Sequence, residues 1–114
     1  MTEQFEAIVE RLQRQQGVQG VMLVGVDDGM VIAGDAGQDR DSDTAAALAA
    51  SLFRRTRMAA SDAGLGDATF VRLEADRGHV CATARGDVVI VTVASSGINL
   101  GRLRLEMLGA VEML

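Results

Sequence analysis

Apolar and polar positions follow two different periods along the 114-residue chain, and the changes of period mark out eight elements. Apolar residues three and four positions apart, which line one face of a helix, predict helices over residues 2–16, 42–63 and 98–114. Short apolar runs bounded by turn residues predict strands over residues 18–26, 30–34, 68–75, 79–85 and 88–94. The pattern contains neither a linker nor a repeat, so we expect one domain over residues 1–114.

Two of the predicted strands, at residues 21–26 and 88–93, are apolar on both of their alternating faces. A sheet that is apolar on both faces must be covered on both faces, and three helices can do that. We therefore predict an α/β (α+β) fold in the order helix, two strands, helix, three strands, helix. Its centre is a five-stranded antiparallel sheet with helices on both faces.

Residues 24–37, VGVDDGMVIAGDAG, combine four glycines with three aspartates and raise the question of a phosphate or metal site. The chain has no lysine, so the phosphate-binding P-loop, which requires one, is excluded. The glycines also do not open a helix, as a dinucleotide-binding fingerprint would require. Asp-Gly between two apolar runs is a strong hairpin signal, and we interpret this stretch as a structural turn.

Asp39, Asp41 and Asp43 occupy the first, third and fifth positions of a possible calcium loop. Such a loop needs glycine at position six and glutamate at position twelve, where this chain has Thr44 and Ala50. We therefore interpret the aspartates as caps of the long helix, because acidic side chains stabilise a helix N-terminus.

His79 and Cys81 lie two positions apart on a predicted strand, so their side chains project from one face. The chain has one His and one Cys, so a metal site or catalytic triad would need carboxylates or a second subunit. A metal-dependent hydrolase built on His79 and aspartates is the weakest of the functions considered. We interpret both residues as packed side chains and expect no catalytic residue, metal ion or cofactor.

The composition narrows the range of partners. A net charge of −5 and the absence of Tyr and Trp argue against nucleic acid, whose binding relies on basic surfaces and aromatic stacking. No apolar run approaches the length that spans a membrane, and the acidic start MTEQFE is unlike a secretory signal. With one cysteine, which excludes an internal disulfide, we expect a cytoplasmic protein without direct membrane insertion.

The predicted long helix carries small residues on two opposite sides. The side expected to lie on the sheet holds Ala45, Ala49, Leu52, Thr56, Ala59 and Ala63. The opposite side holds Ala47, Ala50, Arg54, Met58 and Ser61. Charge is missing from the first half of that side, unlike a helix that faces water, so we predict contact with a second copy across a two-fold axis. An alanine-rich surface helix without a partner is the alternative.

Three arginines, Arg54, Arg55 and Arg57, lie in the last turns of the same helix. Cations near a helix C-terminus are favourable because they complement the helix dipole. Contact with an acidic surface on a partner explains them equally well, and the sequence does not separate the two interpretations.

Three stretches together resemble a known family: GVQGVMLVGVDDGMVIA, the polar stretch leading into AAALAASL, and INLGRLRLEML. No single motif is diagnostic, but their order and spacing over nearly the whole chain resemble the Roadblock (dynein light chain, LC-type) family. The similarity is to its small prokaryotic members related to the gliding regulator MglB. It implies a profilin-like fold and homodimers in which the long helices pack antiparallel and the third strands pair.

The resemblance implies a dimer interface in two parts. The helix seam consists of Ala47, Ala50, Arg54, Met58 and Ser61. The strand seam lies within residues 69–74 and includes Thr69, Val71 and Leu73. A heterodimer with a related chain would require the same apolar seam, so the sequence does not distinguish it from a homodimer.

The resemblance also implies a function. Family members are usually not enzymes, and the MglB-like ones bind a Ras-like small GTPase and promote GTP hydrolysis without donating an arginine. We therefore expect a non-enzymatic homodimeric platform that binds and regulates such a GTPase, with Arg54, Arg55, Arg57 and Met58 as contacts. The alternative is a purely structural adaptor in a motor or kinase-linked complex, without effect on nucleotide turnover. The chain ends with the last predicted helix, so no role of a C-terminal tail is expected.

Overall fold

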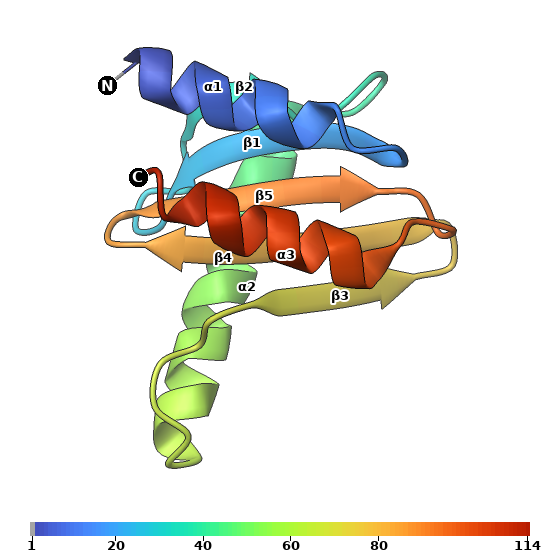
Figure 1. The fold of residues 1–114 in the computed structure, drawn as a ribbon. Coiled ribbons are helices and arrows are strands. Elements are labelled where there is room, and N and C mark those ends of the chain that lie inside the picture. The colour runs from blue at the N-terminus through green and yellow to red at the C-terminus, as the bar shows by residue number, and fades with distance from the viewer. Residues whose placement is uncertain (1) are drawn as a thin grey trace.

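The computed structural model describes residues 2–114 and contains the predicted elements in the predicted order (Figure 1). They are α1 (Thr2–Gln13), β1 (Val18–Gly25), β2 (Val31–Asp35), α2 (Ser42–Asp62), β3 (Val71–Ala75), β4 (Gly78–Arg85), β5 (Val88–Ala94) and α3 (Leu100–Val111). The largest differences are at element ends. α1 and β3 are each three residues shorter than predicted, and α3 is five residues shorter. α3 begins after Asn99, whose side chain accepts a hydrogen bond from the Arg102 backbone N–H at 3.0 Å.

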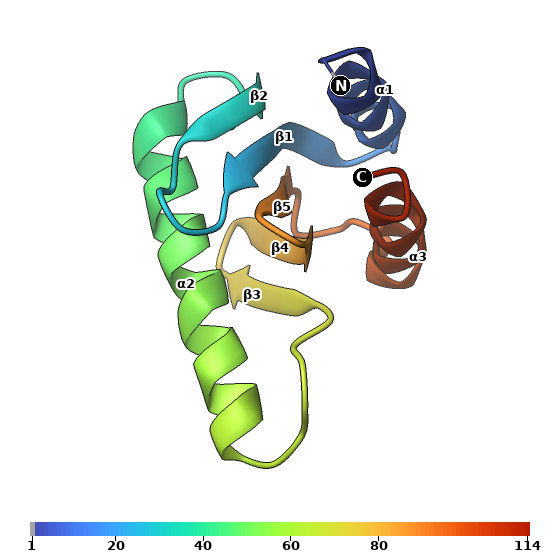
Figure 2. The same ribbon diagram turned by 90° about the vertical axis from the view of Figure 1, so that its left-hand side faces the viewer.

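The five strands form one sheet in the order β2-β1-β5-β4-β3, with every neighbouring pair antiparallel. Helices α1 and α3 lie side by side on one face of the sheet, and α2 lies on the other (Figure 2). The predicted fold class, a five-stranded antiparallel sheet with helices on both faces, is confirmed.

Alternate residues of the central strands supply two separate cores. On β1, Val21 and Leu23 pack in the core beneath α1 and α3, whereas Met22 and Val24 pack in the core beneath α2. All four side chains are completely buried. The apolar character of both strand faces is therefore explained by a helical layer on each side.

Capping residues hold the start of α2 in place. The Asp41 carboxylate accepts hydrogen bonds from the Thr44 backbone N–H at 3.2 Å and from the Thr44 hydroxyl at 2.9 Å. These bonds stabilise the ionised form and lower the pKa of Asp41 from its ordinary value. The predicted capping role of the aspartates is confirmed at Asp41.

His79 and Cys81 both point into the layer between the sheet and the α1–α3 pair. His79 is 5% exposed and its Nε2 atom lies 3.4 Å from the carbonyl oxygen of Ser96. Cys81 is completely buried, and this burial raises the pKa of its thiol. Within the described residues, no three His, Cys, Asp or Glu side chains gather closely enough to hold a metal ion.

We expect the Cys81 thiol to resist alkylation in the folded protein. A raised pKa leaves little thiolate at pH 8, and burial denies the reagent access. Iodoacetamide labelling followed by mass spectrometry should therefore be slow in buffer and fast in urea. Equal rates under the two conditions would contradict the placement of Cys81 in the core.

Candidate functional site

Helix α2 is longer than the part of the sheet that it covers. It crosses the back of the sheet and continues past the edge strand β3 (Figures 1 and 2). Its buried residues end at Phe53, and none of residues 54–62 is buried. Residues 54–62 thus extend beyond the sheet, beside its edge strand β3, and we call them the projecting half of α2.

The first half of α2 presents a different face to the sheet from the one predicted. Its buried residues are Ala46, Ala49, Ala50 and Phe53, which have the i, i+3, i+4, i+7 spacing of one helix face. The helix is therefore rotated by about one residue, or roughly 100°, from the prediction. The assignment of Ala50 to the helix seam is wrong, because its side chain is completely buried within the protomer.

The small residues of α2 have a role within the protomer that the sequence analysis missed. The turn after β1 approaches the helix at Gly29, where an added Cβ would lie 3.1 Å from the Ala47 Cα and 3.7 Å from the Ala50 Cβ. Gly29 also has a φ of +69°, a left-handed conformation that favours glycine. Small side chains are thus needed on α2 so that the turn can pack against it.

Other residues predicted on the helix seam are at the surface. Ala47 and Ser61 are exposed, and the Met58 side chain is 65% exposed. Leu48, which was not predicted as a site residue, is 68% exposed. Together with the exposed Arg55, Leu48 and Met58 define what we call the outer face of α2. Two residues expected on the sheet, Ala59 and Ala63, are instead exposed.

The three arginines of α2 have different surroundings. The Nη1 atom of Arg54 donates hydrogen bonds to the carbonyl oxygens of Val26 and Asp27, at 2.6 Å and 3.4 Å, and so attaches the helix to the β1–β2 turn. The guanidinium of Arg57 lies over the Phe53 ring, 4.9 Å from its centroid. Arg55 is exposed. Of the three, Arg55 offers the guanidinium best placed to meet another molecule.

The two edges of the sheet differ in how well they could accept another strand. The pairing of β2 shifts register between Leu23 and Val24, and Gly34 in β2 has a φ of +80°. Such irregularities protect an edge from further pairing. The pairing of β3 with β4 runs through all five β3 residues in one register. β3 is therefore the edge that is open to another strand.

The predicted strand-seam residues lie on or just before β3. Val71 and Leu73 belong to the strand, and Leu73 is 43% exposed although it is a large apolar residue. Thr69 precedes the strand, and its carbonyl oxygen accepts a hydrogen bond from the Thr83 hydroxyl at 2.8 Å. The prediction that the strand reaches Thr69 is corrected, because the pairing of β3 with β4 begins at Val71.

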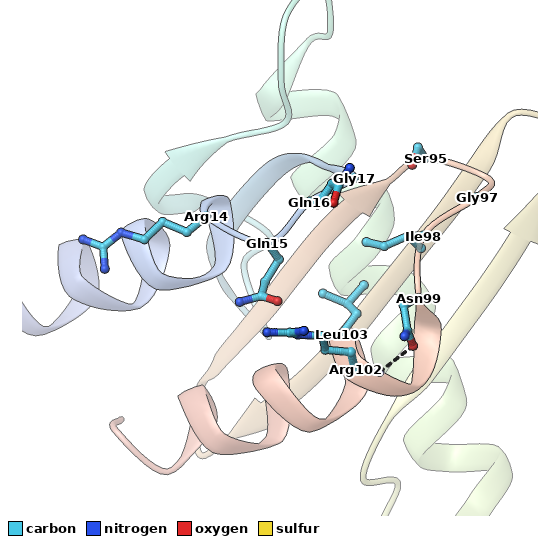
Figure 3. Close-up of a pocket in the computed structure, with 10 residues that line it drawn as sticks. All are labelled: Arg14, Gln15, Gln16, Gly17, Ser95, Gly97, Ile98, Asn99, Arg102 and Leu103. Atoms are coloured by element: carbon cyan, nitrogen blue, oxygen red, sulfur yellow. Dashed lines mark hydrogen bonds between the residues drawn. The ribbon is translucent and has the colours of Figure 1, made fainter.

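A cleft of about 870 Å³ lies on the opposite face of the protein, between the end of α1 and the start of α3 (Figure 3). Polar side chains including Gln15, Asn99 and Arg102 line it, with Ile98 and Leu103 at its apolar wall. No pattern in the sequence indicated it, because it forms between segments about eighty residues apart.

Among residues 2–114 there is no helix long and apolar enough to cross a membrane.

Comparisons with known proteins agree with this architecture. An uncharacterised protein of Methanocaldococcus jannaschii is 27% identical over 108 residues, which cover 95% of this chain and 94% of the relative. The structure of a Roadblock/LC7 domain from Streptomyces avermitilis superimposes with a TM-score of 0.81 at 22% identity, covering 98% of this chain and 92% of that one. Myxococcus xanthus MglB superimposes with a TM-score of 0.85 at 24% identity, covering 97% and 84%.

At these identities the solved structures establish a shared fold. The family profile of the Roadblock/LC7 domain matches residues 4–95, which is most of the sequence and includes the whole sheet. The chain therefore belongs to the Roadblock/LC7 domain family.

Proposed function

We propose that the protein is a non-enzymatic homodimeric platform that binds a Ras-like small GTPase and regulates its GTP hydrolysis. The observation that carries the proposal is the combination of an open edge strand, β3, with the projecting half of α2 beside it. In a Roadblock/LC7 chain this combination provides a place for a second copy. A structural relative is MglB in a tetrameric arrangement, and this supports self-association.

The dimer that we propose joins β3 to β3 and places the projecting half of each α2 over the partner's sheet. Residues 54–62 would then gain a surface to pack on, which they lack in one protomer. The helix seam keeps Ser61 from the sequence prediction and loses Ala50, and Met58 moves from the seam to the outer face of α2. Arg54 contributes at most its exposed part, since its guanidinium is bonded to the β1–β2 turn.

The outer face of α2 is the surface that we propose for the GTPase. It combines two exposed apolar side chains, Leu48 and Met58, with the exposed guanidinium of Arg55. Apolar anchors beside an arginine are the typical composition of the central part of an interface. The same surface fits an adaptor role, in which a partner binds without any change in nucleotide turnover.

The test uses Met58→Glu and a matched control, Leu105→Glu. Leu105 is 69% exposed on α3, on the other side of the sheet, so the two changes are alike in chemistry and exposure. We expect Met58→Glu to weaken binding of a small Ras-like GTPase from the same genome at least about tenfold, or about 1.4 kcal/mol. Leu105→Glu should bind like the wild type.

Binding would be followed by calorimetry and hydrolysis by single-turnover assays with excess platform. A faster hydrolysis that Met58→Glu abolishes would support regulation. A complex without a change in rate would support the adaptor function. If neither a complex nor a rate change occurs, or if both variants behave alike, the assignment of the outer face of α2 fails.

A further inference from the structure

We propose that β3 pairs with β3 of a second copy in one particular register, centred on Leu73, in which Arg72 lies opposite the partner's Glu74. This inference rests on the dimer proposed above and names its geometry and its partner. The sequence of β3, VRLEA, has opposite charges placed symmetrically about the central leucine. The edge is therefore complementary to a second copy of itself.

The backbone of β3 determines which of its groups face outward. Ala75 and Gly78 flank a two-residue turn and pair directly across the β3–β4 hairpin. In such a hairpin the flanking pair exchanges backbone hydrogen bonds, and the direction then alternates along the strand. The N–H and C=O groups of Ala75 and Leu73 consequently point towards β4. Those of Arg72 and Glu74 point away from the sheet, towards an incoming strand.

Symmetry restricts the possible registers. Residues directly opposite each other in an antiparallel pair project from the same face of the sheet. A two-fold axis normal to the sheet maps each face onto itself, so both α2 helices lie on the same side. One residue must therefore lie directly opposite its own copy across the axis. A register in which neighbouring residues face each other is excluded, because neighbours project from opposite faces of the sheet. The central candidates are Arg72, Leu73 and Glu74.

Two independent criteria select Leu73 among these three. A centre at Arg72 would place two arginines opposite each other, and a centre at Glu74 would oppose two glutamates, which is unfavourable in both cases. A centre at Leu73 instead pairs Arg72 with the partner's Glu74 twice. It is also the register that pairs all five residues of β3, with Val71 opposite the partner's Ala75.

The exposure of the side chains agrees with this register. Arg72 and Glu74 are exposed on the α1–α3 side of the sheet, where they pair across from Cys81 and His79. Leu73 lies on the α2 side and is 43% exposed. Its position opposite the partner's Leu73 would bury an apolar side chain at the centre of the interface, beneath the projecting halves of the two helices.

Cysteine cross-linking tests the register. Leu73 and the partner's Leu73 would form a non-hydrogen-bonded pair with Cα atoms about 4.5 Å apart, which lies within the range of a disulfide. We expect Leu73→Cys to form a disulfide-linked dimer on mild oxidation. Ala75→Cys is the matched control, because its two copies would be offset by four residues, or about 13 Å. The wild type should not cross-link, because Cys81 is completely buried.

Charge reversal tests the partner. Arg72→Glu and Glu74→Arg each create two like-charge pairs, so each variant alone should dimerise about tenfold more weakly than the wild type. An equimolar mixture restores opposite charges in both pairs and should form a heterodimer with wild-type strength. Both residues are exposed, so circular dichroism should show a native fold in each variant.

The possible outcomes separate this inference from the proposed dimer. Cross-linking of Leu73→Cys together with rescue in the mixture would support the register. The register would be overturned if Ala75→Cys cross-linked and Leu73→Cys did not, or if the mixture of the two charge variants showed no rescue. The proposed dimer would still stand in that case, provided that the wild type had a dimeric mass. A monomeric mass for the wild type would overturn both.

Discussion

Replacing Ala50 with glutamate should unfold the protein at room temperature. The Ala50 side chain projects from α2 and is completely buried against the sheet and the β1–β2 turn. Its neighbours in this core include Met22, Val24 and Phe53, which offer no partner to a carboxylate. An unpaired buried charge with added volume costs several kcal/mol, out of the roughly 5–15 kcal/mol by which a domain of this size is stable.

Leu48→Glu is the control for this substitution, since Leu48 lies on the same helix two residues earlier and is 68% exposed. We expect its free energy of unfolding to stay within about 0.5 kcal/mol of the wild type. Urea unfolding followed by circular dichroism measures both variants. If Ala50→Glu stays folded and merely becomes monomeric, the residue belongs to a helix seam after all, and the orientation of α2 described above is incorrect.

Glu74→Pro should abolish dimerisation while leaving each protomer folded. The N–H of Glu74 points away from β4, so proline removes no bond inside the protomer, and edge strands tolerate it there. In the proposed dimer the same change removes one backbone hydrogen bond from each protomer and introduces a steric clash. A loss of about 3 kcal/mol, or roughly 100-fold in the dissociation constant, is the expected result.

Leu73→Pro provides the contrast, because the N–H of Leu73 points towards β4. This variant should lose stability as well as dimerisation. Sedimentation velocity reports the association state, and thermal unfolding reports the stability of each chain. A Glu74→Pro protein that remained dimeric at low micromolar concentration would show that β3 is not the pairing edge.

Most of the fold could be predicted because strand period and turn chemistry are local signals. The strand predicted at residues 88–94 coincides with β5, and the Asp-Gly turn forms the predicted hairpin. The start of β3 was misplaced because its first predicted residues have the composition of a strand. Pairing with β4 begins only at Val71, and the carbonyl oxygen of Thr69 is bonded to the side chain of Thr83, a long-range contact that a local pattern does not reveal.

The orientation of α2 was predicted incorrectly because its hydrophobic pattern is weak. Five alanines between positions 45 and 50 make several faces nearly equivalent. Phe53 is the one large aromatic side chain in the helix, and it marks the buried face correctly. Packing against the sheet and against Gly29 decides which face of α2 is buried. The orientation of the helix therefore depends on tertiary contacts that the sequence pattern does not show.

The residues of the candidate site were predicted only in part, because the predicted orientation of α2 was wrong. Met58 and Leu73 are exposed apolar residues, as an interface requires. Met58 was named from the helix period and the resemblance, and Leu73 from the resemblance alone. Leu48 was missed because the helix was rotated in the prediction. The attachment of Arg54 to the carbonyl oxygen of Val26 joins residues 28 positions apart and could not be foreseen.

The central claim is that two copies of the chain form one structural unit through β3. Its most direct test is the molar mass of the wild-type protein by light scattering, measured over a range of concentrations down to low micromolar. One chain has a mass of 12.0 kDa. We expect a mass of twice that value throughout the range. A mass that stays at 12.0 kDa would contradict it.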